Sequence, residues 1–157
     1  EKVRAYLTPY GVTQRIRELE VSSATVELAA QAVGCEPARI AKTLSFMADQ
    51  KAVLIVAAGD AKVDNHKYKE QFHTKAKMLS PDEVTELVGH SVGGVCPFGV
   101  KEGVAVYLDE SLKRFDVVYP ACGSASSAVK LTIPELETAS GYLGWIDVCK
   151  GWGEDSI

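Results

Sequence analysis

A lysine expected on the inner face of a strand is the first residue of this sequence that could do chemistry. Residues 40–48 alternate as a strand does and place Lys42 on the same face as Leu44 and Phe46. An ammonium group is costly to bury unless it is paired or lines a cavity. Lys42 is therefore either a cation facing a site or a lysine whose stem reaches the sheet edge, and the pattern leaves both open.

A glycine-rich segment over residues 89–99 is the second candidate. It combines four glycines and a proline with valines and a phenylalanine, which is too apolar for a solvated linker. Such a segment inside a packed domain allows backbone amides to approach a ligand closely. The spacing matches neither G-x-x-x-x-G-K-[ST] nor G-x-G-x-x-G, which argues against a phosphate-binding loop.

A loop of small residues, Gly123, Ser124, Ala125 and Ser126, lies between two expected strands. It could supply amides and hydroxyls to a small polar ligand, or it could be a serine-rich turn. No G-x-S-x-G elbow surrounds these serines, which argues against a Ser-His-Asp hydrolase. The four cysteines show no C-x-x-C spacing and the three histidines are scattered, so we expect no metal and no cofactor.

The net charge of −4 excludes a protein that coats nucleic acid by bulk charge. The local charge differs from the net charge, because residues 62–77 are rich in lysine. This basic segment is either a solvated helix face or a surface that touches a phosphate backbone. Its candidate tRNA-contacting residues are Lys62, Lys67, Lys69 and Lys75.

The elements that must position these residues follow from periodicity and capping. We expect one domain of 157 residues, of the α+β (mixed α/β) class with a largely antiparallel sheet. The expected strands are 40–48, 52–58, 104–108, 117–121, 128–131 and 145–149, and the first two form a hairpin. The expected helices are 25–33, 63–72, a helix from the capping box Ser80–Glu83 to Gly89, a turn at 109–114, and a helix from the capping box Thr132–Glu135 to Gly141. Residues 3–19 are expected to be helical.

The cellular setting is inferred from absences in the sequence. No apolar run approaches the ~18 residues that a membrane helix needs, so no membrane association is expected. Scattered cysteines in a chain without a leader indicate a reducing compartment, and we expect a cytoplasmic protein.

Several segments together resemble the YbaK/prolyl-tRNA synthetase-associated domain family. The resemblance runs from about Val21 to about Gly141, with family-like order and spacing. The segments that carry it are Ala41-Lys42-Thr43-Leu44, 53–60, Val63-Asp64, Val92 to Gly99, and Tyr119 to Gly123.

This resemblance implies a curved mixed sheet surrounded by helices, and a domain that hydrolyses the ester between a wrong amino acid and its tRNA. Residues 1–157 would form a single free-standing editing domain, with 1–20 as an N-terminal helical extension. The expected substrate is a mischarged tRNA, an aminoacyl-tRNA synthetase is an expected partner, and no DNA is expected.

The resemblance also assigns roles at the site. Lys42 matches the family's essential lysine, and Gly93 and Gly94 match its glycine motif. The amides of Gly93, Gly94 or the loop at Gly123 would hold the carbonyl oxygen. Substrate would be bound and sized by Val95, Pro97, Phe98, Gly123, Ser124, Ala125 and Ser126. The expected amino acid is a small one (alanine, serine, threonine or cysteine). The loop at Gly123 departs from YbaK itself, which argues against cysteine and makes the chain resemble the branches that clear alanine, serine or threonine.

Two other functions remain open at this point. One is a non-catalytic module that binds aminoacyl-tRNA as a regulator or sensor, and the other is a hydrolase of an unrelated small molecule.

Overall fold

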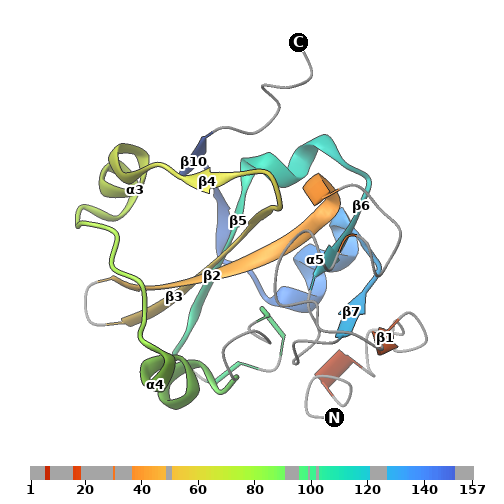
Figure 1. The fold of residues 1–157 in the computed structure, drawn as a ribbon, viewed down its shortest axis with the longest axis horizontal. Coiled ribbons are helices and arrows are strands. Elements are labelled where there is room, and N and C mark those ends of the chain that lie inside the picture. The colour runs from red at the N-terminus through yellow and green to blue at the C-terminus, as the bar shows by residue number, and fades with distance from the viewer. Residues whose placement is uncertain are drawn as a thin grey trace.

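Six strands in the described part of the chain form one mixed sheet (Figure 1). The computed structural model describes residues 6–7, 16–18, 30, 37–48, 51–90, 96–98, 100–101, 103–120 and 127–150. The strand order is β8 (Leu131–Thr132), β6 (Val117–Pro120), β2 (Ile40–Ala48), β3 (Lys51–Ala58), β5 (Ala105–Asp109) and β9 (Gly144–Ile146). Two smaller pairs, β1 (Ile16–Glu18) with β7 (Ser127–Val129) and β4 (Lys62–Val63) with β10 (Cys149–Lys150), flank it.

The pairing is mixed, but the six-stranded sheet is not largely antiparallel as expected, because three of its five pairings are parallel. Of the seven pairings among the described strands, four are antiparallel, including the β2–β3 hairpin. The pairs β2–β6, β3–β5 and β5–β9 are parallel. The α+β fold with a curled mixed sheet is therefore confirmed.

The hairpin forms the centre of the sheet because β3 is apolar on both faces. Every residue of β3 after Lys51 is buried, as expected for a strand covered on both sides. The register pairs Lys42 with Ala57 and Leu44 with Ile55. This register places Lys42 near the end of β3, where the chain turns toward β4.

The helices begin and end where their capping residues predict. Ser80 and Glu83 form a capping box at α4 (Pro81–Glu83), which continues as a wider helical turn, η4 (Val84–Val88), and stops at Gly89 with φ of 95°. Thr132 and Glu135 form a second capping box at α5 (Ile133–Ser140). Helix α3 (Asn65–Phe72) starts at Asp64, whose carboxylate accepts from two main-chain amides. These capping signals are local in the sequence, which is why the helix starts can be predicted from it.

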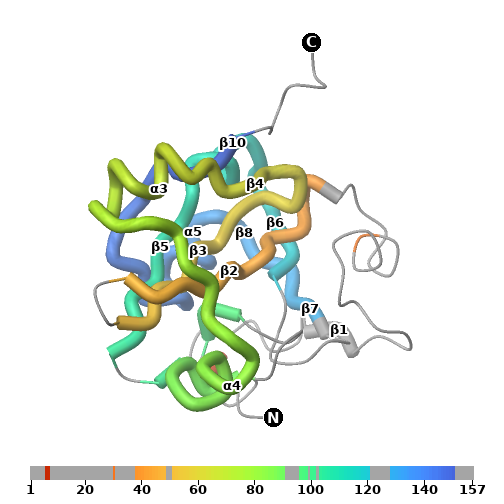
Figure 2. The backbone as a smooth tube through the Cα atoms, turned by 60° about the vertical axis from the view of Figure 1, so that its left-hand side comes forward, coloured from red at the N-terminus to blue at the C-terminus, as the bar shows by residue number. Residues whose placement is uncertain are grey.

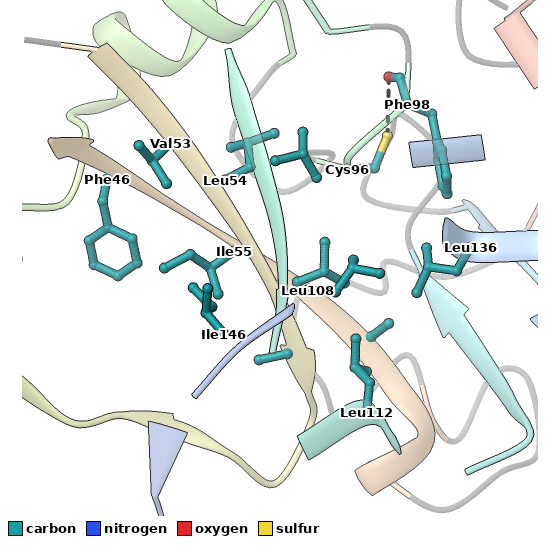
Figure 3. Close-up of a cluster of buried hydrophobic side chains, with 14 of the residues drawn as sticks. Phe46, Val53, Leu54, Ile55, Cys96, Phe98, Leu108, Leu112, Leu136 and Ile146 are labelled. Carbon is teal, nitrogen blue, oxygen red and sulfur yellow. Dashed lines mark hydrogen bonds between the residues drawn. The ribbon is translucent and has the colours of Figure 1, made fainter. Parts of the chain in front are cut away.

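The core is one continuous cluster between the sheet and its covering elements (Figure 3). Leu54 and Ile55 of β3 and Leu108 of β5 have no exposed surface. Helix α5, which passes behind β2 and β6 in Figure 1, contributes Leu136. Helix α3 adds Tyr68, whose ring centroid lies 5.1 Å from that of Phe46.

Two expectations about secondary structure are wrong. Residues 16–18, expected to be helical, form strand β1, because main-chain pairing with β7 overrides the weak helical pattern. The single strand expected over 145–149 is two strands, β9 and β10, which belong to different sheets. The helix expected over 25–33 lies outside the described residues except for Ala30, which is helical.

Candidate active site

Lys42 is held in place by the turn that follows β3. Its side chain is half-buried, and its Nζ donates to the carbonyl oxygens of Ala61 and, at 3.4 Å, Gly59. Two carbonyl acceptors offset part of the cost of removing an ammonium from water. The structure therefore places a charged group at a fixed position beside the end of β3.

A buried carboxylate, Asp109, lies at the end of the neighbouring strand β5. Asp109 has no exposed surface, and it accepts from the main-chain amides of Ser111 at 2.9 Å and Val148 at 3.0 Å. The Ser111 hydroxyl in turn accepts from the amide of Ala58 at 3.1 Å. These bonds join the ends of β3 and β5 to the segment that leads into β10.

The buried thiol of Cys149 lies close to Asp109. Burial, together with the charge and hydrogen bond of Asp109, raises the pKa of the Cys149 thiol from 9.0 to about 12, while Lys42 acts in the opposite direction. Lys42 and Asp109 thus both lie within electrostatic reach of one sulfur atom. Sequence reasoning missed Asp109, although an aspartate between a strand and a helical turn is a cap signal.

The described part of the glycine-rich segment is closed by a histidine. His90 is buried, and its Nε2 lies 2.8 Å from the carbonyl oxygen of Phe98, an oxygen that can only accept, so this nitrogen carries a proton. Cys96 Sγ lies 3.6 Å from the same nitrogen and donates to the same carbonyl at 3.7 Å (Figure 3 shows the second bond). His90 is therefore a structural hydrogen-bonding residue that fixes the two ends of residues 90–98.

Pro97 and Phe98 are buried, and Phe98 has no exposed surface at all. They anchor the segment to the core, and their contact with substrate stays a prediction. The remaining predicted residues of the site lie outside the described residues: Gly93, Gly94, Val95, Gly123, Ser124, Ala125 and Ser126. Of the predicted catalytic and substrate-binding residues, the structure therefore describes Lys42, Pro97 and Phe98.

The basic segment lies on and around α3, at the upper left of Figure 1. Lys62, Lys69 and Lys75 are exposed. Lys67 differs, because its Nζ donates to Asp147 Oδ1 at 3.1 Å and to the carbonyl of Cys149 at 3.0 Å. The hydrogen bond to Asp147 raises the pKa of Lys67. Its ammonium therefore has a structural role in tying α3 to β10.

Two further features can be stated for the described residues. No three side chains of His, Cys, Asp or Glu among them gather in a way that could hold a metal ion. None of the helices found there is long and apolar enough to cross a membrane.

The fold is that of a small α+β domain with a curled mixed sheet, and a lysine is held beside this sheet. Comparison with known proteins identifies the family. The model of the aminoacyl-tRNA editing domain matches residues 20–139. The chain therefore belongs to the aminoacyl-tRNA editing domain family.

Relatives in sequence are of two kinds. The chain is 53% identical over 153 residues to the uncharacterized protein YwhH of Bacillus subtilis (strain 168), covering 97% of this chain and 98% of that protein. It is 29% identical over 101 residues to the proline–tRNA ligase of Geobacillus sp. (strain WCH70). That match covers 64% of this chain and only 18% of the ligase, so it concerns one part of a much larger protein.

Solved structures share nearly the whole fold. One, reported as a "putative trans-editing enzyme for prolyl tRNA synthetase", is 32% identical with a TM-score of 0.86, and the match covers 96% of each chain. Another, the hypothetical protein APE2540, is 27% identical with a TM-score of 0.84, covering 96% of this chain and all of that one.

Proposed function

We propose that this chain is a trans-editing aminoacyl-tRNA deacylase that hydrolyses the ester of a tRNA mischarged with a small amino acid. The observation that carries the proposal is the match of the editing-domain model to residues 20–139, with Lys42 fixed beside the sheet. The similarity to a structure described as a trans-editing enzyme gives further support.

The chemistry needs little from the protein. An aminoacyl ester is already activated, so its hydrolysis requires a positioned water and donors that stabilise the developing oxyanion. Lys42 contacts the ester region or the terminal phosphate and orients the 3′ end of the tRNA. The amides of Gly93 and Gly94 hold the carbonyl oxygen, and the ribose hydroxyl of the substrate helps to activate the water.

Selection of the amino acid follows from size. A synthetase discriminates by only ~1–3 kcal/mol per methylene against a smaller amino acid, so a second small site can remove the errors that remain. Val95 and Ala125 are the proposed walls, with Phe98 supporting the segment from the core. Ser124 and Ser126 contact the amino acid, which is alanine, serine, threonine or cysteine.

The proposed partners are the mischarged tRNA and an aminoacyl-tRNA synthetase, because relatives include segments of proline–tRNA ligases. The proposed location is the cytoplasm, where charged tRNA is used. Lys62, Lys69 and Lys75 are proposed to touch the acceptor-stem backbone.

The test is a deacylation screen over tRNAs mischarged with alanine, serine, threonine and cysteine, under multiple turnover. We expect wild type to release at least one of these amino acids catalytically. Because Lys42 acts on charge in the transition state, Lys42→Ala should lower kcat/KM by roughly 10²–10³-fold. Lys51→Ala is the matched control, since Lys51 is an exposed lysine on the strand paired with β2.

Near-normal turnover by Lys42→Ala would remove Lys42 from the mechanism. A wild-type protein that binds and protects the ester without releasing amino acid would instead establish a binding module, the regulator or sensor considered above. Activity on small esters that tRNA does not compete for would point to an unrelated hydrolase.

A further inference from the structure

The Lys42 ammonium takes its position from a turn rather than from its own strand. Two of its acceptors are the carbonyls of Gly59 and Ala61, the residues on either side of Asp60. A lysine stem has four flexible carbons, so the ammonium follows wherever these two carbonyls are held. What fixes the turn 59–61 therefore fixes the charge.

A bidentate ion pair between Arg114 and Asp60 holds the turn 59–61. Arg114 Nη1 lies 3.0 Å from Asp60 Oδ2, and Arg114 Nη2 lies 2.5 Å from Asp60 Oδ1. The two side chains are only 24% and 33% exposed. A bidentate guanidinium–carboxylate pair restricts orientation as well as distance, which a single-point lysine pair cannot do.

Arg114 is itself immobilised from two other directions. Its Nε donates to the carbonyl of Ser111 at 3.0 Å, and its guanidinium lies 4.8 Å from the centroid of the Phe115 ring. Arg39, which precedes β2, lies 4.9 Å from the same ring. The turn η5 (Glu110–Arg114) and the start of β2 thus meet at one end of the sheet (Figure 2).

A second bond joins η5 to the same turn. The Ser111 hydroxyl accepts from the amide of Ala58, the residue directly before Gly59. The main chain on the N-terminal side of the turn and the Asp60 side chain within it are therefore both anchored to η5. Such double attachment leaves the carbonyls of Gly59 and Ala61 little freedom to move.

We propose that Asp60 and Arg114 are positioning residues for Lys42: their ion pair holds the turn 59–61 so that its carbonyls keep the ammonium aimed at the substrate. Neither residue touches the reacting atoms. The kinetic part of this inference rests on the proposed deacylase function, whereas its structural part does not.

The kinetic test compares Asp60→Asn and Arg114→Gln with wild type on the mischarged tRNA that gives the highest turnover. A misplacement of about 1 Å can cost up to about 10²-fold in rate, so we expect kcat to fall about 10- to 100-fold with little change in KM. Because the two residues act as one pair, the double variant should lose no more than the worse single variant. Arg114→Lys, which keeps the charge without the fork, should lose activity to an intermediate extent.

The matched control is Lys113→Gln. Lys113 lies on the same turn η5, but its ammonium pairs with Glu110 at 3.0 Å and lies 4.7 Å from the centroid of the Trp145 ring rather than against Asp60. We expect its kcat to stay within about twofold of wild type, as for a surface pair.

A second readout does not depend on activity. The rate at which acetic anhydride modifies Lys42, measured by peptide mass spectrometry against exposed Lys51 in the same sample, reports how firmly the ammonium is held. We expect the Lys42/Lys51 ratio to rise about tenfold in Asp60→Asn and Arg114→Gln, equivalent to losing one charge-assisted interaction, and to stay unchanged in Lys113→Gln.

Two results would overturn the inference. A lower melting temperature with unchanged kcat and an unchanged Lys42/Lys51 ratio would make the ion pair merely stabilising. A folded Arg114→Lys variant with wild-type kcat and a wild-type Lys42/Lys51 labelling ratio would also show that the ion pair does not position Lys42. Failure of wild type to deacylate any tRNA would refute the proposed function alone, since the labelling ratio would still decide the positioning role.

Discussion

Buried polar side chains determine the geometry at the end of β5, where Asp109 accepts two main-chain hydrogen bonds and faces the Cys149 thiol. An acceptor with no exposed surface must be matched, because each buried unpaired group costs about 1–3 kcal/mol. Neither the composition nor the periodicity of the sequence indicates which donors will pair with a buried acceptor such as Asp109. Only the fold, by pairing β10 with β4, brings Cys149 toward Asp109.

The Cys149 thiol should make stability depend on pH in the alkaline range. Its pKa is about 12 in the folded protein, against 9.0 ordinarily, so the folded state keeps a proton that the unfolded chain loses. The stabilising contribution is complete below pH 9 and is lost as the pH rises from about 9 to about 12. Urea unfolding between pH 8 and pH 10.5 should show a free energy of unfolding that falls more steeply in wild type than in Cys149→Ala.

The control for that experiment is Val148→Ala, a buried neighbour whose loss destabilises the protein but retains the thiol. Val148→Ala should keep the wild-type slope. Equal slopes in all three proteins would mean that the thiol titrates alike in the folded and unfolded states.

The strand face of Lys42 could be predicted from the sequence, but its hydrogen-bond acceptors could not. The alternation of β2 correctly singled it out as a lysine on a face shared with the buried Phe46. The pattern could not reveal its acceptors, because Gly59 and Ala61 are main-chain groups of a turn 17 and 19 residues away. Main-chain acceptors leave no mark on the side-chain pattern.

At the scale of elements, most strands and helices could be predicted because their signals are local. The β2–β3 hairpin and the two proline-containing capping boxes formed as expected. The failures were non-local. Strand β1 forms by pairing with β7, in which Ala128 lies opposite Arg17, 111 residues away in the sequence. Strands β9 and β10 separate because they join different sheets. Pairing partners far apart in sequence override weak local preferences.

The lysines on and just after helix α3 differ in their surroundings. Lys67 is engaged with Asp147 and Cys149, whereas Lys69 and Lys75 are exposed. We therefore expect Lys69→Ala and Lys75→Ala to weaken tRNA binding, and each to reduce the slope of log K against log salt by roughly 0.7–0.9 if it removes one phosphate contact. Lys67→Ala should mainly lower the melting temperature.

Binding is measured by fluorescence anisotropy with labelled tRNA between 50 and 200 mM salt, a range over which phosphate contacts are strongly screened. Lys130→Ala is the control, because Lys130 is exposed but lies outside the basic segment. If the Lys69, Lys75 and Lys130 variants all retain the wild-type salt slope, α3 does not face the tRNA backbone.

At the scale of the whole molecule, the described residues nearest the N-terminus, 6–7 and 16–18, are part of the folded body. The family model begins at residue 20, yet Leu7 lies in the core with no exposed surface. The Tyr6 hydroxyl donates to the carbonyl of Ala139 in α5 at 2.7 Å, and β1 pairs with β7. β7 directly follows the loop proposed to contact the amino acid, so this pairing links the N-terminal segment to one side of the proposed site.

Leu7→Ala tests whether this segment is structurally integral or a dispensable extension. Removing a fully buried leucine deletes apolar contacts and leaves a cavity, so we expect the free energy of unfolding to fall by about 2–5 kcal/mol in urea titrations. The control is Leu143→Ala, since Leu143 is 66% exposed and its loss should change stability by less than about 0.5 kcal/mol. A Leu7→Ala variant as stable as Leu143→Ala would show that the burial of Leu7 does not stabilise the domain. A destabilised variant would mean that the folded unit of this chain extends beyond residues 20–139, which the family model matches.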